Sequence, residues 1–166
     1  MIEFTVYGRA RTKGSTRSFV KNGKVITRDA SGNEGLIWEQ NVASAAFVAR
    51  EQAGGRIAPH QPVAVDVTFY VPRNKGDWGT GRNAHKLRPS APRYPATRPD
   101  VDKFLRRALD ALTGILYADD GQVVEVLARK RWGDPPRAEV KVWVLGEQAE
   151  DGQLSFRPDE QLALTG

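Results

Sequence analysis

The sequence predicts an α+β fold of mixed α/β character, with a single mixed sheet and two main helices packed on it. Residues 63–71 and 140–144 alternate apolar and polar side chains, and glycine or proline ends each run. Residues 33–52 and 100–113 carry apolar side chains at helical spacing. A period of two residues is typical of strands, and a period of 3.6 is typical of helices. Helices that pack on one sheet give a layered domain.

The composition is that of a globular protein with one domain. The chain has 166 residues, of which 40% are hydrophobic and 27% charged, which suffices for a buried core without cross-links. It has no cysteine, so disulfides, thiolate metal sites and cysteine nucleophiles are excluded. No apolar run approaches the roughly 20 residues of a membrane span, and no signal peptide is apparent. We therefore expect a cytoplasmic protein without membrane association.

Positive charge is concentrated in two segments. The net charge is +5 and the pI is about 9.7. Seven basic residues and no acid lie between Arg9 and Arg28, and seven basic residues opposed only by Asp77 lie between Arg73 and Arg98. Most charge runs are solvated loops. Two acid-poor segments in one small domain instead favour a polyanionic partner.

The N-terminal third is expected to form a strand, a hairpin and a helix. Residues 2–6 alternate as a strand does. Asn22-Gly23 lies between short β-prone runs, and this pair favours a hairpin because both residues accept positive φ. A helix is expected from Asn33 to about Gln52, with Phe47 among the residues at helical spacing.

The middle of the chain is expected to form a strand, a long loop and a second helix. Residues 63–71 alternate over the whole run, and Pro72 closes it. Residues 73–98 are rich in proline, glycine and basic side chains without periodicity, which is typical of a functional or mobile loop. The second helix is expected from Asp100 to Thr113. Its apolar stripe consists of Val101, Phe104, Leu105, Ala108, Leu109 and Leu112.

A β-hairpin is expected at the end of the fold. Residues 123–128 and 140–144 alternate, and Gly133-Asp134-Pro135-Pro136 between them is a turn sequence. We therefore expect the two runs to pair antiparallel, while the pattern leaves the strand order open. Residues 1–146 are expected to form one domain, and residues 147–166 an acidic, partly disordered tail.

Four carboxylates flank the second predicted helix. Asp100 and Asp102 begin it, and Asp119 and Asp120 follow it. Mg²⁺ is usually held by a few carboxylates with phosphates and water, and it can activate the water that cleaves a phosphodiester. The structural alternative makes Asp100 an N-cap, Asp102 a partner of the helix dipole and Asp119-Asp120 a turn. Co-occurrence of the acids beside a basic loop favours the metal site.

These residues resemble the RusA family of Holliday junction resolvases. The family pattern is Lys-Pro-Asp-x-Asp-Asn, then a helix with Leu-Asp-Ala-Leu, then Asp-Asp-x-Gln-Val-Val. The opening of this chain, with Lys13-Gly14 and Arg17, is also similar, and the similarity covers about residues 2–145. The pattern stands here as Arg98-Pro99-Asp100-Val101-Asp102-Lys103, Leu109-Asp110-Ala111-Leu112 and Asp119-Asp120-Gly121-Gln122-Val123-Val124.

The resemblance implies a homodimeric, magnesium-dependent endodeoxyribonuclease of bacterial or phage origin, with Mn²⁺ as an alternative ion. Such an enzyme makes paired nicks across a four-way DNA junction during DNA recombination and repair. The resemblance also implies that Asp100, Asp102 and Asp120 are essential metal-binding carboxylates and that Asp119 is a less critical one.

Two basic residues depart from the family pattern, and a third matches it. Lys103 stands where the family has asparagine, and Arg106 stands where a family member has a catalytic lysine. Lys130, ten residues after Asp120, matches a family lysine. Lys130 is equally compatible with an outward-facing position on a strand. We expect Arg106, Lys103 or Lys130 to stabilise the charge that develops during cleavage.

The basic loops are expected to hold the DNA backbone, with binding that weakens steeply as salt rises. Two other functions are compatible with the same residues: a nuclease for flaps and other branched DNA, and a non-catalytic protein that binds junctions or single strands. Carboxylates beside the phosphate path would repel DNA in a pure binding protein, which favours catalysis. The expected DNA-binding residues are Lys13, Arg17, Arg82, Lys86, Arg88, Arg93, Arg98 and Lys103.

Overall fold

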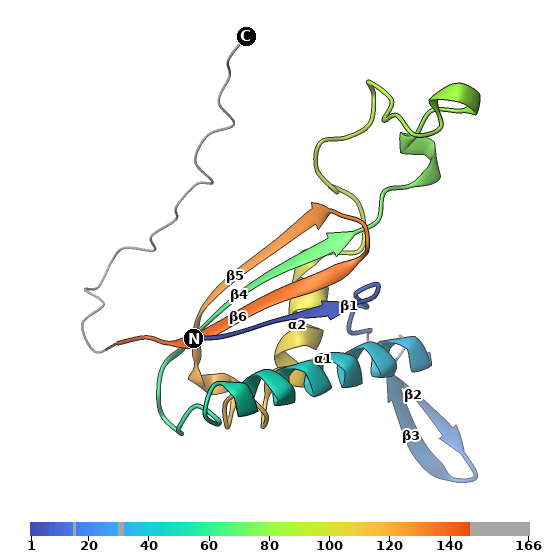
Figure 1. The fold of residues 1–166 in the computed structure, drawn as a ribbon. Helices are drawn as coiled ribbons and strands as arrows, with labels where there is room; N and C mark the ends of the chain where they lie inside the picture. Colours follow the sequence, from blue (N-terminus) through green and yellow to red (C-terminus); the bar gives the residue numbers. More distant parts are fainter. Residues whose placement is uncertain (15, 30–31, 147–166) are drawn as a thin grey trace.

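The computed structural model describes residues 1–14, 16–29 and 32–146 (Figure 1). The acidic tail expected over residues 147–166 lies outside this part of the chain. The main elements are, in chain order, β1 (Ile2–Tyr7), β2 (Thr16–Lys21), β3 (Lys24–Asp29), α1 (Gly32–Gln52), β4 (Val63–Val71), α2 (Val101–Leu112), β5 (Val123–Trp132) and β6 (Arg137–Val144). Three short 3-10 turns are η1 (Lys75–Asp77), η2 (Gly81–Asn83) and η3 (Asp120–Gln122).

The main sheet has four strands in the order β1-β6-β4-β5. β6 runs antiparallel to both β1 and β4, and β5 runs parallel to β4. The sheet is therefore mixed, and with its two long helices it confirms the predicted α+β class. β2 and β3 form a separate two-stranded hairpin. Its turn, Asn22-Gly23, has positive φ at both residues (53° and 74°), as the sequence predicts.

The predicted hairpin between the last two strands is wrong. β4 lies between β5 and β6 and pairs with both. Val63, Val65, Val67 and Phe69 of β4 are each no more than 2% exposed. The most apolar strand takes the centre of the sheet, and the more polar β5 takes an edge. The alternation of a strand depends only on its own residues. It therefore does not indicate which strand occupies the centre of the sheet.

The core lies between one face of the sheet and the helices. Ile2, Val142 and Val65 lie opposite one another on three neighbouring strands. Each is at most 6% exposed. Because the side chains of a strand alternate between faces, this register places the apolar residues of all three strands on the same side.

α1 and α2 cover that side of the sheet. The ring of Trp38 on α1 lies 6.4 Å from that of Phe69, which lies 5.3 Å from the ring of Phe104 on α2. Phe47, expected on the apolar face of α1, is 50% exposed, whereas Trp38 is 3% exposed. The face of α1 that packs is therefore centred on Trp38 rather than on Phe47.

α2 matches its predicted bounds within a residue. Asp100 is its N-cap and Thr113 its C-cap, and Gly114 follows with a positive φ of 79°. The helix also carries one fully buried charge, Arg107, whose Nη1 lies 3.0 Å from Glu39 Oε2. This ion pair joins the two helices.

One end of the sheet carries the second basic segment, residues 73–98. β4 and β5 are parallel, and Val71 lies opposite Trp132 where both strands end. Residues 73–98 leave the sheet there and extend beyond it (Figure 1). No helix in the described ranges combines the length and the apolar character that crossing a membrane requires.

Candidate active site

Asp100 occupies the N-cap position of α2, yet its side chain accepts no capping hydrogen bond. Its Oδ2 instead lies 2.9 Å from Nζ of Lys103, and both side chains are about half exposed. The hydrogen bond and the charge of Lys103 lower the pKa of the Asp100 carboxyl, and the charges of Arg98 and Lys130 act in the same direction. The result is an ionised carboxylate that is open to solvent.

Asp102 and Arg106 lie one turn apart on α2, and both are exposed. Side chains four residues apart share one face of a helix. The beginning of α2 therefore presents Asp102 and Arg106 together on one exposed face, directly after the carboxylate of Asp100.

Lys130 connects β5 to the segment before α2. Its Nζ donates to the carbonyl oxygens of Thr97, at 2.5 Å, and Pro99, at 2.7 Å. Lys130 is half-buried, and its amine contacts backbone oxygens at an exposed position. These two bonds hold the residues that immediately precede Asp100.

Asp119 and Asp120 lie beyond the other end of α2, at η3. Asp119 caps this turn, because its Oδ1 accepts from the backbone N–H of Gly121 at 2.8 Å. Gln122 fixes the turn to a distant loop, since its Nε2 donates to the carbonyl of Ala58 at 2.9 Å. Asp120 is exposed. Asp119 thus forms the turn that the structural alternative predicts, whereas the contact of Gln122 with Ala58 is one that the sequence pattern did not indicate.

α2 separates the two sets of carboxylates. Its 12 residues correspond to about 18 Å of helix, with Asp100 and Asp102 at the beginning and Asp120 after the end. Within residues 1–14, 16–29 and 32–146, no three histidine or acidic side chains form a group that could hold a metal ion. Mg²⁺ is usually held by one or two carboxylates plus substrate phosphates and water. The exposed oxygens of Asp100 and Asp102 fit that donor set.

The expected DNA-binding residues fall into several groups. Nζ of Lys13 pairs with Oδ2 of Asp110 on α2. Arg98 and Lys103 flank Asp100 in the sequence. Arg17 lies on β2, but its side chain lies outside the described part of the chain. The four remaining residues are exposed on the segment after β4: Arg82, Lys86, Arg88 and Arg93.

Residues 73–98, which we call the basic arm, have a defined local structure. A single β-bridge pairs Trp78 with Leu87, and the backbone N–H of Gly79 donates to the carbonyl of Lys86 at 2.9 Å. Trp78 and Leu87 are 36% and 45% exposed. The loop expected from the sequence is therefore a folded arm with apolar side chains near its basic ones.

The base of the basic arm is attached to β5 through Trp132. The indole Nε1 of Trp132 donates to the carbonyl of Pro92 at 3.0 Å. The guanidinium of Arg73 lies 5.0 Å from the ring centroid. Trp132 thus joins the two ends of the arm to the sheet, a role that the sequence did not indicate.

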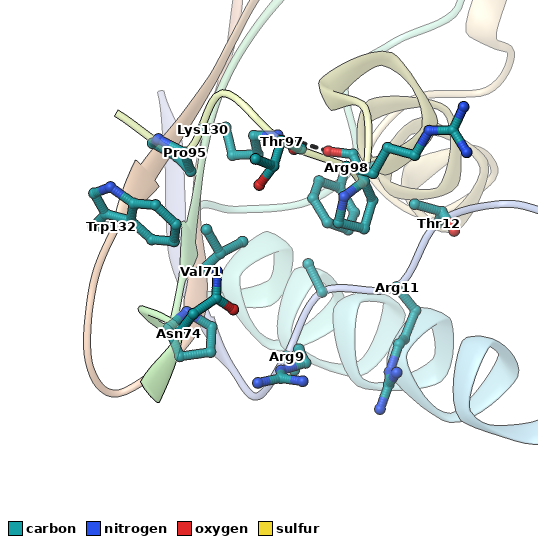
Figure 2. Close-up of a pocket in the computed structure, with 14 residues that line it drawn as sticks. Arg9, Arg11, Thr12, Val71, Asn74, Pro95, Thr97, Arg98, Lys130 and Trp132 are labelled. Carbon is teal, nitrogen blue, oxygen red and sulfur yellow. Dashed lines mark hydrogen bonds between the residues drawn. The ribbon is translucent and has the colours of Figure 1, made fainter. Parts of the chain in front are cut away.

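A pocket of about 300 Å³ lies beside this attachment, next to the segment that leads to Asp100 (Figure 2). Four basic residues line it and no acid does. Arg9 and Arg11 belong to the first basic run of the sequence but are not among the expected DNA-binding residues. The pocket is lined by Arg9, Ala10, Arg11, Thr12, Val71, Pro72, Asn74, Pro95, Thr97, Arg98, Pro99, Phe104, Lys130 and Trp132.

The chain is similar to a nuclease family and to a bacterial protein. A family model described as endodeoxyribonuclease RusA matches residues 9–143. This span includes both basic segments and all four carboxylates around α2. The uncharacterized protein YqaN of Bacillus subtilis (strain 168) is 35% identical over 141 residues, which cover 85% of this chain and 94% of YqaN.

Proposed function

This chain belongs to the RusA family of endodeoxyribonucleases, and from that membership we propose that it resolves four-way DNA junctions by paired, Mg²⁺-dependent nicks. The proposal is that Asp100 and Asp102 form the metal-binding part of the active site. The basic arm and the first basic segment, which is the run between Arg9 and Arg28, hold the DNA around this site. The observation that carries the assignment is the environment of Asp100.

Asp100 stands at the N-cap position of α2 but does not make the hydrogen bond of a capping residue. An aspartate selected to cap a helix accepts a hydrogen bond from a backbone N–H of the first turn. Asp100 accepts none and faces Lys103 instead. Its lowered pKa keeps the carboxylate charged. These features support a role as a ligand for a cation over a role in stabilising α2.

Mg²⁺ bound here would supply an activated water and would stabilise charge on the leaving oxygen. The side chains of this chain then have separate tasks. Asp100 and Asp102 hold the ion together with a DNA phosphate. Arg106, on the same helix face as Asp102, neutralises that phosphate. Lys130 fixes the segment before Asp100 through its two carbonyl contacts, which orients the carboxylate.

We assign Asp120 to the active site of a second copy in a homodimer. Within one chain, α2 lies between Asp120 and the pair Asp100 and Asp102. Family resemblance implies both that Asp120 is essential and that the protein is a homodimer. A twofold dimer in which each copy lends Asp120 to the other meets both requirements. It also matches the near-twofold symmetry of a four-way junction.

The decisive experiment compares three labelled substrates: a four-way junction, a flap and a linear duplex, each with Mg²⁺ and with EDTA. Asp102→Asn is the test variant. Glu3→Gln, an exposed acid on the far edge strand β1, is the matched control. Symmetric nicks on the junction alone, lost with EDTA and in Asp102→Asn but kept in Glu3→Gln, are the expected result.

The other outcomes have definite meanings. Equal cutting of the flap would retain the nuclease but replace junction resolution by a broader action on branched DNA. Tight junction binding with no product under any divalent ion would reject the nuclease and leave a binding protein.

A further inference from the structure

The pocket between the first basic segment and the base of the basic arm has the size of a small-ligand site. Its volume is about 300 Å³, at the lower end of the range for such sites. We propose that it takes one unstacked nucleotide of the branched DNA, next to the phosphate that is cleaved. This inference rests on the proposed function and adds to it a means of recognising the branch.

The charges of the pocket suit a nucleotide phosphate. Arg9 and Arg98 come from different segments and lie on different sides of the pocket (Figure 2). Neither forms an ion pair with any residue in the described ranges, whereas Arg11 pairs with Glu34 at 2.6 Å. Two guanidinium groups are therefore available. Guanidinium groups bind phosphate oxygens in a bidentate manner that lysine does not reproduce.

The remaining walls suit a base. Trp132 lines the pocket, and its indole is already fixed by the carbonyl of Pro92 and the guanidinium of Arg73. Phe104, which is 1% exposed, also lines it. Because the Trp132 ring is held in place before any ligand arrives, binding a base against it would cost little ordering of the protein. The buried Phe104 adds apolar surface beside it.

The position of the pocket couples base capture to cleavage. Thr97, Arg98 and Pro99 line it and lead directly into Asp100. Lys130, which also lines it, holds the carbonyls of Thr97 and Pro99. A nucleotide in the pocket would therefore lie against the segment that carries Asp100.

Branched DNA can fill such a pocket more easily than a linear duplex. A base must leave the stack to enter, and the cost of unstacking is smallest where bases are already unpaired or mispaired. At a branch point the stacking is interrupted. The pocket would thus favour branched over linear DNA by a contact with one base rather than by backbone contacts alone.

The test measures binding of the full chain to four-way junctions in EDTA. Each junction carries one abasic nucleotide, placed in turn at every position within two nucleotides of the branch. An abasic nucleotide keeps its phosphate and loses only the base. We expect weakening of roughly tenfold at one symmetry-related position and no change elsewhere. A 2-aminopurine at that position should change its fluorescence when the protein binds.

Variants then assign the effect to the pocket. Trp132→Ala should bind the intact and the abasic junction equally well, and Trp132→Phe should restore the difference. Trp143→Phe is the matched control, because Trp143 lies on β6 and does not line the pocket. Trp132 also anchors the basic arm, so Trp132→Ala could fail to fold. In that case the binding of the unmodified protein to intact and abasic junctions still tests whether a base is bound.

Equal binding of the unmodified protein to intact and abasic junctions at every position would overturn the proposal and leave a phosphate site at most. An abasic effect that persists in Trp132→Ala would place the base elsewhere and would also overturn it. Nuclease activity is measured separately on the intact junction with Mg²⁺. A protein that shows the abasic effect but never cuts would refute the proposed function and not the pocket.

Discussion

Nζ of Lys130, on the edge strand β5, lies 2.7 Å from the carbonyl oxygen of Pro99, the residue directly before Asp100. A second bond, to the carbonyl of Thr97, completes the attachment. A lysine matched by sequence to a family lysine thus contacts the backbone that leads to Asp100, the proposed metal ligand. We therefore propose that Lys130 positions Asp100.

Replacing Lys130 distinguishes positioning from charge. Lys130→Met removes both hydrogen bonds and should lower the cleavage rate at least tenfold, with a loss of about 1–3 kcal/mol in the free energy of unfolding. Lys130→Gln retains an N–H donor without the charge and should keep most of the activity. Single-turnover rates and thermal unfolding of both variants provide the measurement. If Lys130→Gln were as inactive as Lys130→Met, the ammonium charge itself would be required.

Loss of the Lys103 contact should raise the pKa of Asp100 toward the usual aspartate value. Lys103 is the main cause of the lowered pKa, so Lys103→Met removes the hydrogen bond and its charge together. A lowered pKa contributes stability above the ordinary aspartate pKa, and that stability is lost as the pH falls through the lowered value. Lys103→Met should therefore have a lower free energy of unfolding than the unmodified protein at neutral pH, and the two values should become equal in acid.

The titration of Asp100 is followed by NMR of its side-chain carboxyl carbon in metal-free protein. Lys141→Met, which removes a lysine on the central strand β6 away from α2, is the control. An unchanged Asp100 titration in Lys103→Met would show that this ion pair does not set the charge of the site.

Mixing two inactive variants tests whether Asp120 acts across a dimer. Asp102→Asn and Asp120→Asn should each be inactive alone. After they are unfolded and refolded together, half of the dimers are mixed, and each mixed dimer has one site with neither substitution. Nicking should return to about a quarter of the unmodified level. If both acids served the same chain, every site would carry a substitution and the mixture would stay inactive.

The basic arm should contribute phosphate contacts that depend on salt. Arg82→Gln and Lys86→Gln should each reduce the slope of log binding constant against log salt concentration by about 0.9. The ratio of junction to duplex affinity should stay unchanged, because phosphate contacts carry no shape or sequence information by themselves. Lys141→Gln serves as the control. Fluorescence anisotropy titrations at four salt concentrations would measure the slopes, and an unaltered slope would remove the arm from the DNA path.

Local patterns in the sequence are sufficient to predict these individual helices, strands and turns. The alternation of residues 63–71 predicts β4, the pair Asn22-Gly23 predicts the β2–β3 turn, and the apolar stripe after Asp100 predicts α2. The family motif placed acids at both ends of that helix. These features succeed because helix and strand periods, caps and tight turns depend on residues that are neighbours in the chain.

The tertiary structure decided how these elements meet. The alternating runs of β5 and β6 predicted a hairpin, but β4 lies between them because its almost wholly buried side chains need the centre of the sheet. The same arrangement brings Lys130 to Pro99 and forms a pocket from segments around Arg9, Arg98 and Trp132. Contacts of this kind join residues far apart in the chain. They follow from the competition of all apolar surfaces for burial, which no local period records.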